Sequence, residues 1–409
     1  MNKKYLILAI IFAVILGISI PLFFYFKTTY RRMVVVPNKI ELASPTATPT
    51  PDPNRPISLL LLGYGGAGHD GPYLTDSIML VRINPKLEKV DLISIPRDLW
   101  VSIPISTESS LSAKINLAYT IGINDKKYPN KSAEYTGLAG GGEMSKYVAF
   151  QVTGIKPDYF FALDFSGFKT IIDKIGGIDI NVPRSFIDPL YPLDVDSSET
   201  CGKSEEEVKA LTATMSGEKL EEQFPCRYET LTFNKGLNHF DGSTALKYAR
   251  SRHSPTEGND FSRSERQKQV IEAVKNKVLS LNFFNKIIPV SEALSYHLTT
   301  DMDLSTMEKL LIRAPDFSKY KINSIAITDK NYLMQSVSAD RQSILIPKAG
   351  DGNFEEIIEF LEKFEKRFGN YRYQCATKTK IKTKIKHRGR VDPSKKQKLE
   401  RALGTAEFG

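Results

Sequence analysis

The chain has few of the residues that build disulfide-rich scaffolds or zinc sites. Its 409 residues include three cysteines and five histidines, and no two cysteines show CxxC spacing. Small disulfide scaffolds are dense in cysteine, and structural zinc sites need Cys or His at short spacings. The disulfide-rich class is excluded, and a Cys/His zinc site is not expected. A hydrophobic content of 41% predicts instead a globular fold with one large or two medium cores.

A basic excess over the body of the chain is also missing. The net charge is +9, but eleven Lys or Arg and two acidic residues lie between Lys378 and Arg401. The rest is close to neutral, whereas nucleic-acid-binding domains carry basic surfaces. We therefore expect no nucleic-acid partner. Residues 369–409 are predicted to form a basic, disordered tail, with contact to anionic lipid or wall polymer as the alternative.

One long apolar run stands near the start of the chain. Residues 5–26 carry no charge, and about twenty apolar residues suffice for a helix to cross a bilayer. A cleaved signal would end in small residues, whereas Leu22 to Phe26 are bulky. We predict a cytoplasmic tail (1–4), a transmembrane anchor (5–26), and a juxtamembrane segment with a Pro/Thr-rich spacer (27–56). Such a spacer suits a single-pass protein of the cell membrane with its domain on the extracytoplasmic side.

Short apolar runs of strand length then alternate with helical periodicity. The predicted strands are 57–64, 77–83, 90–96, 158–165, 178–183, 321–327 and 343–347, and the predicted helices are 166–177, 263–281 and 354–368. Strands that alternate with helices indicate a three-layer α/β/α fold with a central mixed sheet. We predict one domain over residues 57–368, interrupted by a polar insertion at about 190–228.

Four arginines gather in the segment from Tyr248 to Gln267, namely Arg250, Arg252, Arg263 and Arg266. Ser262 and Glu265 have capping-box spacing, so Ser262 is predicted to cap a helix that begins at Arg263. Cations at a helix N-terminus are unfavourable unless an anion lies beside them, and guanidinium groups match phosphate oxygens two at a time. A pyrophosphate is the predicted ligand. The alternative is a solvated basic helix start.

A second polar group lies at predicted strand ends. Asp76 precedes one strand, Arg97 and Asp98 follow another, and Lys114 and Asn116 come shortly after. Sites in α/β proteins lie at strand ends, and Mg2+ binds one or two carboxylates together with phosphate oxygens. Asp76 is therefore a candidate ligand for Mg2+, or for Mn2+ in its place. Residues 63–71 are glycine-rich but match no phosphate-loop motif, so a flexible loop is expected there.

These segments resemble the LytR-CpsA-Psr family of bacterial envelope phosphotransferases. The motifs that carry the resemblance are LLLGY, TDSIMLVRINP, ISIPRDLWV, AKINLAY, FSGFKTIIDKIGGIDINVP, GLNHFDGSTALKYARSRH and DFSRSERQKQVI, in that order after the apolar run. The resemblance implies transfer of a glycopolymer from a polyprenyl-pyrophosphate carrier to peptidoglycan. One departure is that Gly63, Tyr64 and Gly65 stand where the family has GxD. Either Asp70 replaces the missing aspartate, or Asp76 serves alone.

The residues and the resemblance together predict a site. The expected catalytic residues are Arg97, Asp98, Arg250, Arg252 and Asp260, with Asp98 or Asp260 as the base. The expected pyrophosphate ligands are Lys114, Asn116, Arg263, Arg266 and Gln267, and the metal ligands Asp76 and Asp70. A metal and guanidinium groups would stabilise the charge that develops as an acceptor hydroxyl attacks phosphorus. The alternatives are a pyrophosphatase and a non-catalytic envelope-binding or regulatory protein.

Cys201 and Cys226 lie at either side of the polar insertion. Outside the cytoplasm a disulfide between them would close a loop of about 26 residues and contribute roughly 3 kcal/mol in the chain-entropy model. Two free thiols are an equally open interpretation, and Cys375 has no partner in either.

Overall fold

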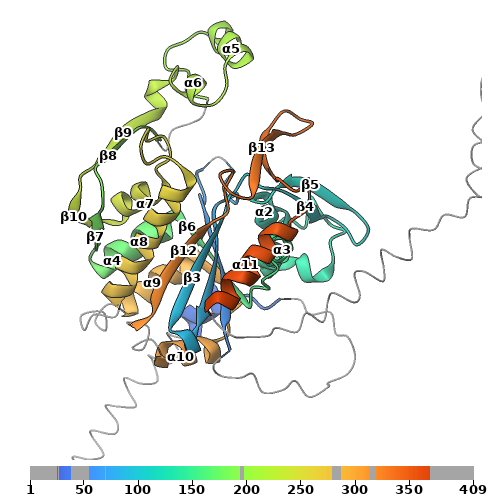
Figure 1. Ribbon diagram of the computed structural model, residues 1–409, viewed down its shortest axis with the longest axis vertical. Helices are drawn as coiled ribbons and strands as arrows, with labels where there is room; N and C mark the ends of the chain where they lie inside the picture. The colour runs from blue at the N-terminus through green and yellow to red at the C-terminus, as the bar shows by residue number, and fades with distance from the viewer. Residues whose placement is uncertain are drawn as a thin grey trace, which may run out of the picture. The chain divides into compact units, whose positions relative to one another are not determined.

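A six-stranded mixed sheet, in the order β11-β6-β1-β2-β3-β12, forms the centre of the protein (Figure 1). The computed structural model describes residues 25, 27–37, 55–69, 71–193, 198–278, 287–313 and 319–368. β1 is parallel to β6 and β3 to β12, while β2 is antiparallel to both β1 and β3. The predicted mixed sheet is confirmed. Its strands are β1 (Ile57–Tyr64), β2 (Thr75–Asn84), β3 (Lys89–Ile95), β6 (Tyr159–Asp164), β11 (Leu298–Thr300) and β12 (Lys321–Ala326).

Both faces of the sheet are apolar because successive side chains of each strand point to opposite faces. Leu60 pairs with Leu80 and with Phe160, and all three are fully buried on one face. Val81 lies on the other face and packs in a cluster against Ile271 of α8 (Asp260–Val278). A sheet that buries both faces needs helices on both, as predicted.

Helices cover each face. α3 lies over β6 on one side, and α8 lies over β12 on the other, with α4 packed against α7 and α9 (Figure 1). The remaining bounds are α2 (Leu117–Ile123), α3 (Gly137–Thr153), α4 (Phe165–Ile175), α7 (Gly242–Arg250), α9 (Ile287–His297), α10 (Leu304–Arg313) and α11 (Glu355–Phe368). α4 ends at Gly176, whose φ of 85° is left-handed, as the Gly-Gly pair predicted.

The sequence did not predict α3, because its GLAGGG start has low helix propensity. Close packing explains the helix. A Cβ on Gly122 of α2 would lie 2.3 Å from the carbonyl oxygen of Gly140, and one on Gly142 would lie 2.1 Å from the Phe160 ring. These glycines let α3 approach both α2 and the sheet, so packing outweighs the unfavourable propensity.

Four two-stranded ladders lie outside the central sheet. They are β4 (Trp100–Pro104) with β5 (Ser110–Lys114), β7 (Ile178–Val182) with β10 (Gly236–Phe240), β8 (Phe186–Pro192) with β9 (Tyr228–Phe233), and β13 (Leu333–Val337) with β14 (Ser343–Pro347). The insertion predicted at about 190–228 lies between β8 and β9.

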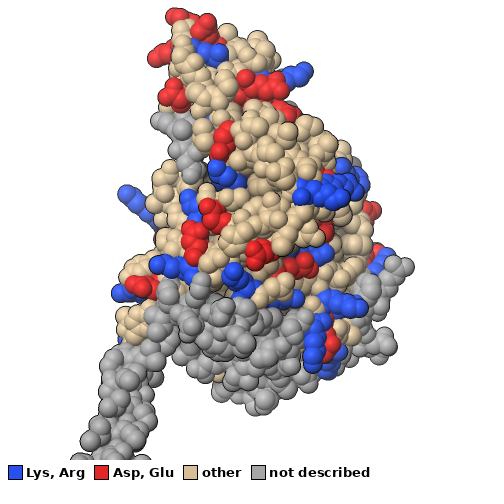
Figure 2. Space-filling model, turned by 90° about the vertical axis from the view of Figure 1, so that its left-hand side faces the viewer, with Lys and Arg blue, Asp and Glu red and all other residues tan. Residues whose placement is uncertain are grey.

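The insertion contains α5 (Glu205–Thr214) and α6 (Glu218–Glu221), and the exposed side chains at this end of the molecule include many acidic ones (Figure 2). Cys201 and Cys226 form a disulfide with their Cα atoms 5.6 Å apart. Of the two open interpretations, the disulfide is the one the structure contains.

The chain divides into two units, 1–361 and 362–409. Of the second unit, the last residues of α11 are described. In the first unit, the backbone N–H of Val35 donates to the carbonyl of Thr300 at 2.9 Å, which joins the juxtamembrane segment to β11. No helix within the described residues has the length and apolar character that a membrane crossing requires. Apart from Tyr25, the predicted anchor lies outside these residues, and it stays a prediction.

Reduction and alkylation should identify the disulfide in solution. Without reductant, we expect Cys375 alone to react with a thiol reagent, because Cys201 and Cys226 are bonded. After reduction, all three should react, and peptide mapping by mass spectrometry reports each site. Alkylation of Cys201 and Cys226 in unreduced, exported protein would contradict the bond.

Candidate functional site

The site lies where strand ends meet at one edge of the central sheet. Ile95, at the end of β3, pairs with Ile78 near the start of β2. Tyr64, at the end of β1, pairs with Thr75 and with Asp164 at the end of β6. The chain segments that follow β1, β3 and β6 therefore lie close together, beside the residues that begin β2.

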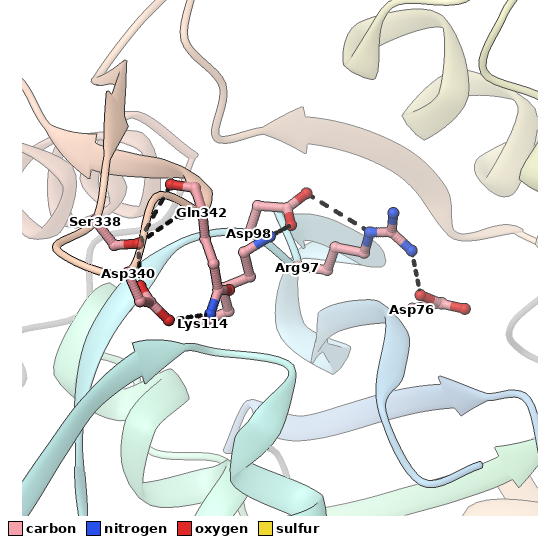
Figure 3. Close-up of polar contacts among 7 residues, drawn as sticks. All are labelled: Asp76, Arg97, Asp98, Lys114, Ser338, Asp340 and Gln342. Carbon is pink, nitrogen blue, oxygen red and sulfur yellow. Dashed lines mark hydrogen bonds and ion pairs between the residues drawn. The ribbon is translucent and has the colours of Figure 1, made fainter. Parts of the chain in front are cut away.

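A cavity of about 500 Å³ opens at this edge, and five of the predicted residues line it, namely Asp76, Arg97, Asp98, Lys114 and Asn116. Arg97 donates from Nη1 to Asp76, and its Nε lies 3.6 Å from an Asp98 oxygen (Figure 3). Lys114 Nζ lies 2.8 Å from the other Asp98 oxygen. Two cations and two carboxylates thus form one connected group, as the strand-end prediction requires.

Backbone contacts fix these side chains in place. The carbonyl of Asn116 accepts from the N–H of Thr75 at 3.2 Å, and its own N–H donates to the carbonyl of Arg97 at 3.3 Å. Through these two hydrogen bonds, the main chain of Asn116 joins the end of β5 to β2 and to the segment after β3. Asn116 is also buried. In the β4–β5 ladder, Lys114 stands directly opposite Trp100.

Neighbouring opposite charges shift the pKa values of Arg97 and Asp98 so that both side chains stay ionised. Burial alone would lower the pKa of Arg97, but the carboxylates of Asp76 and Asp98 outweigh it and raise that pKa. Burial alone would raise the pKa of Asp98, but the Lys114 hydrogen bond and the charges of Arg97, Lys114 and Arg252 lower it. Asp98 is therefore ionised at neutral pH. Within the described residues, the buried Nε of Arg97 has the Asp98 oxygen at 3.6 Å as an ion-pair partner and forms no shorter hydrogen bond.

The arginine segment lies at the same edge. Arg252 is close enough for its charge to lower the pKa of Asp98. The guanidinium carbon of Arg250 lies 4.2 Å from the ring centre of Phe165, the residue after β6, and Nη1 donates to Tyr191 Oη at 3.2 Å. Arg263 is buried in the first turn of α8. The next residue, Ser264, contacts Ser324 at 2.8 Å, so this turn lies beside the last residues of β12. Two segments more than 150 positions apart thus meet.

Asp188 is a residue that the sequence analysis missed. It is fully buried, and one oxygen, Oδ2, accepts from Ser251 Oγ at 2.6 Å and from the N–H groups of Arg252 at 2.8 Å and His253 at 3.2 Å. A buried carboxylate with several donors is strongly held in place. Asp188 therefore positions the backbone that carries Arg252. An acidic residue inside an apolar strand pattern was the available signal.

The insertion also contacts this segment. His253 Nε2 lies 3.1 Å from Glu221 Oε2 of α6. The hydrogen bond with Glu221 raises the pKa of His253, although burial acts in the opposite direction. The polar insertion is therefore packed against a neighbour of Arg252.

Two predictions about α8 need correction. The helix begins at Asp260, and Asn259 caps it by accepting from the N–H of Ser262 at 3.0 Å, so Ser262 is not the cap. Arg266 is not available to pyrophosphate, because its guanidinium donates to the carbonyls of Tyr248 at 2.9 Å, Glu257 at 2.6 Å and Ser251. Burial lowers its pKa to about 10. Carbonyls in the last turn of α7 and in the irregular segment after it account for this buried arginine.

The remaining candidates are placed less fully. Gln267 is half-buried one helical turn after Arg263. Asp260 is the first residue of α8, and Asp70 lies outside the described residues. In the part of the chain that the structure describes, no three His, Cys, Asp or Glu side chains form a metal-binding cluster.

Fold and site together define an α/β protein with Arg97, Lys114 and two carboxylates around a cavity of about 500 Å³ at the edge of its sheet. The LytR_cpsA_psr family model matches residues 24–346. The chain therefore belongs to the LytR_cpsA_psr family.

Known proteins of this kind are similar over much of the chain. "Polyisoprenyl-teichoic acid--peptidoglycan teichoic acid transferase TagV" of Bacillus subtilis (strain 168) is 28% identical over 277 residues, 67% of this chain and 57% of that protein. "Regulatory protein MsrR" of Staphylococcus aureus (strain COL) is 26% identical over 310 residues, 75% of each chain. The match thus spans little more than half of TagV.

A solved structure supports the fold. Protein gbs0355 from Streptococcus agalactiae superposes with a TM-score of 0.51 at 22% identity, over 78% of this chain and 90% of that one.

Unfolding experiments should separate Arg266 from a surface arginine. Arg266→Ala leaves three carbonyls without a buried donor, so we expect the free energy of unfolding to fall by about 3 kcal/mol in urea titrations. Arg184→Ala is the matched control, because Arg184 is exposed and lies 3.7 Å from the side chain of Glu257. Equal stability of the two variants would show that Arg266 does not hold the segment.

Proposed function

We propose that the protein is a phosphotransferase that moves a glycopolymer from a polyprenyl-pyrophosphate carrier to peptidoglycan. The observation that carries the proposal is the connected group of Asp76, Arg97, Asp98 and Lys114 that lines one cavity, with the charge of Arg252 near enough to act on Asp98. Membership of the family and the name of the TagV relative support the substrate class.

The roles of the side chains follow from their contacts. The guanidinium of Arg97, which lines the cavity, and the charge of Arg252 would hold the pyrophosphate oxygens. Arg250 is stacked over Phe165, and Arg263 lies at the start of α8. These two arginines would bind the pyrophosphate from the segment between Tyr248 and Gln267. Guanidinium groups stabilise the charge that develops on a transferring phosphoryl group.

Transfer exchanges one bond to phosphorus for another. An oxygen–phosphorus bond forms from the acceptor hydroxyl, and the bond between that phosphorus and the oxygen of polyprenyl phosphate breaks. The leaving polyprenyl phosphate takes the electron pair, and the hydroxyl proton passes to a carboxylate. Asp98 is ionised and lines the cavity, so it is our candidate for the carboxylate that accepts this proton. Because its pKa is low, it is a weak base, and the proton would move late, when the new bond is largely formed.

The donors at the cavity fit Mg2+, or Mn2+ in its place, when substrate phosphates complete the shell. Asp76 would provide a carboxylate oxygen, and Mg2+ commonly takes one or two of these together with phosphate and water. Bound there, the ion would neutralise charge on the pyrophosphate. In the structure Asp76 is paired with Arg97, whose guanidinium provides positive charge at the same carboxylate.

We place the domain on the extracytoplasmic side of the cell membrane, held by residues 5–26. The Cys201–Cys226 disulfide supports this location, because such bonds persist in oxidising compartments. The lipid carrier and peptidoglycan also meet there. A regulatory role is the second candidate, and the name of the MsrR relative favours it.

Substitution of the arginines should separate a catalytic site from a basic surface. We expect Arg250→Ala, Arg252→Ala and Arg263→Ala each to lower transfer by at least about a thousandfold, since arginines that stabilise transferring phosphate contribute that much. Lysine variants should recover little, because the two-pronged geometry is lost. The measurement is transfer from a polyprenyl-pyrophosphate-linked sugar to peptidoglycan fragments.

Arg388→Ala in the basic tail is the control and should transfer normally. Thermal unfolding of each variant checks that it is folded. If the three site variants transfer as well as the tail control, the arginines form a solvated surface. Free phosphate in place of joined glycan would identify a pyrophosphatase, and unchanged substrate a non-catalytic protein.

Asp76→Asn tests the metal. Removing the charged ligand should weaken the dependence of transfer on Mg2+ and the binding of Mn2+ in the presence of pyrophosphate, followed by electron paramagnetic resonance. Stability should change by less than about 1 kcal/mol, because the carboxylate is partly exposed. Asp351→Asn, at an exposed carboxylate outside this cavity, is the control. Mn2+ binding equal to that of the unmodified protein would remove Asp76 from the site.

A further inference from the structure

The cavity has a second end that the proposed phosphate chemistry does not use. Beyond Lys114, its lining continues with Trp100 and Leu111 from the β4–β5 ladder and with Asp340 and Gln342 from the β13–β14 turn. A volume of about 500 Å³ falls within the range of sites for drug-sized ligands, so there is space for a group larger than pyrophosphate.

Trp100 provides an aromatic surface next to the charged end. It stands directly opposite Lys114 in the β4–β5 ladder, and Lys114 Nζ donates a hydrogen bond to Asp98. A single residue, Lys114, therefore connects Trp100 to the proposed base. It is half-buried, and it is the one tryptophan in the sequence. Aromatic rings of this kind offer a large apolar face at the border of a wet cavity.

The β13–β14 turn is built to hold its polar side chains over the cavity. The N–H of Gln342 donates to Ser338 Oγ at 2.9 Å, and Gln342 Nε2 donates to Asp340 at 2.5 Å (Figure 3). Arg341, between them, adopts a left-handed φ of 63°, which is unusual for a residue with a side chain. The N–H of Leu345 donates to the carbonyl of Asp98 at 3.0 Å, so β14 is bound to the backbone of the site itself.

We propose that Trp100, Asp340 and Gln342 form a saccharide subsite, which binds the acceptor glycan. This inference rests on the proposed function. An aromatic face packs on the C–H face of a pyranose ring, a carboxylate accepts from sugar hydroxyls, and a carboxamide both donates and accepts. The negative charge of Asp340 disfavours the phosphates of the donor and therefore selects the uncharged sugar. A glycan held here presents a hydroxyl towards Asp98.

The single tryptophan gives a direct measurement. A soluble peptidoglycan fragment of two disaccharide units, added to the full chain without lipid donor, should change the emission of Trp100 in a saturable way. Gln342→Ala and Asp340→Asn should each weaken binding roughly tenfold, as expected for the loss of a hydrogen bond to a charged or well-placed polar group. In calorimetry, Trp100→Phe should retain most of the affinity, and Trp100→Ala should lose more than tenfold.

Gln335→Ala is the matched control, because Gln335 is exposed on β13, bonds to Asp329 and does not line the cavity. It should bind like the unmodified chain, and circular dichroism checks the fold of every variant. Inorganic pyrophosphate is the second probe, and its affinity should be the same in the Gln342→Ala and control variants.

Two results would overturn the subsite. One is a Trp100 emission that the fragment leaves unchanged. The other is a Gln342→Ala variant that loses pyrophosphate but not the fragment, which would assign this end to the donor. Because binding is measured without transfer, the two proposals can fail separately. A chain that binds the fragment as expected but transfers no glycan retains the subsite and loses the proposed function.

Discussion

The arrangement of the candidate site depends on one buried carboxylate. Asp188 has no exposed surface, and it accepts hydrogen bonds from the Ser251 hydroxyl and from the backbone N–H groups of Arg252 and His253. Arg266 holds the same segment from α8 through three carbonyls. A buried charge without partners costs several kcal/mol, so neither side chain tolerates a shift of the segment between them. The position of Arg252 relative to the sheet is therefore set by residues that need not touch substrate.

The cavity places positive charges next to an ionised carboxylate, Asp98. Arg97 is paired with Asp76 and lies near Asp98, so these charges largely offset one another. Lys114 and Arg97, and to a smaller extent Arg252, keep Asp98 ionised. A cavity of this kind attracts phosphate without burying an uncompensated cation before the ligand arrives. Electrostatic preorganisation is the physical basis for phosphoryl transfer by arginines.

The sequence was most informative where local rules decide the structure. Strand composition identified seven of the strands, and the mixed sheet followed from their alternation with helices. Strand ends identified the cluster around Asp76 and Arg97. Contacts between distant segments were beyond such rules. α3 forms despite its glycines because α2 and Phe160 require close approach, and Arg266 looks like a phosphate ligand in sequence because carbonyl acceptors leave no local signature.

The insertion is joined to the rest of the domain at its two strand ends and through the contact of Glu221 with His253. It leaves through β8, returns through β9, and is closed near its base by the Cys201–Cys226 bond. α5 buries none of its residues, and a side chain at Gly217 would meet no atom within 4 Å. Loops whose ends are fixed in this way accept added sequence at little entropic cost. The segment between α5 and α6 is thus a natural position for an epitope or a fluorescent reporter, far in sequence from the strands that form the cavity.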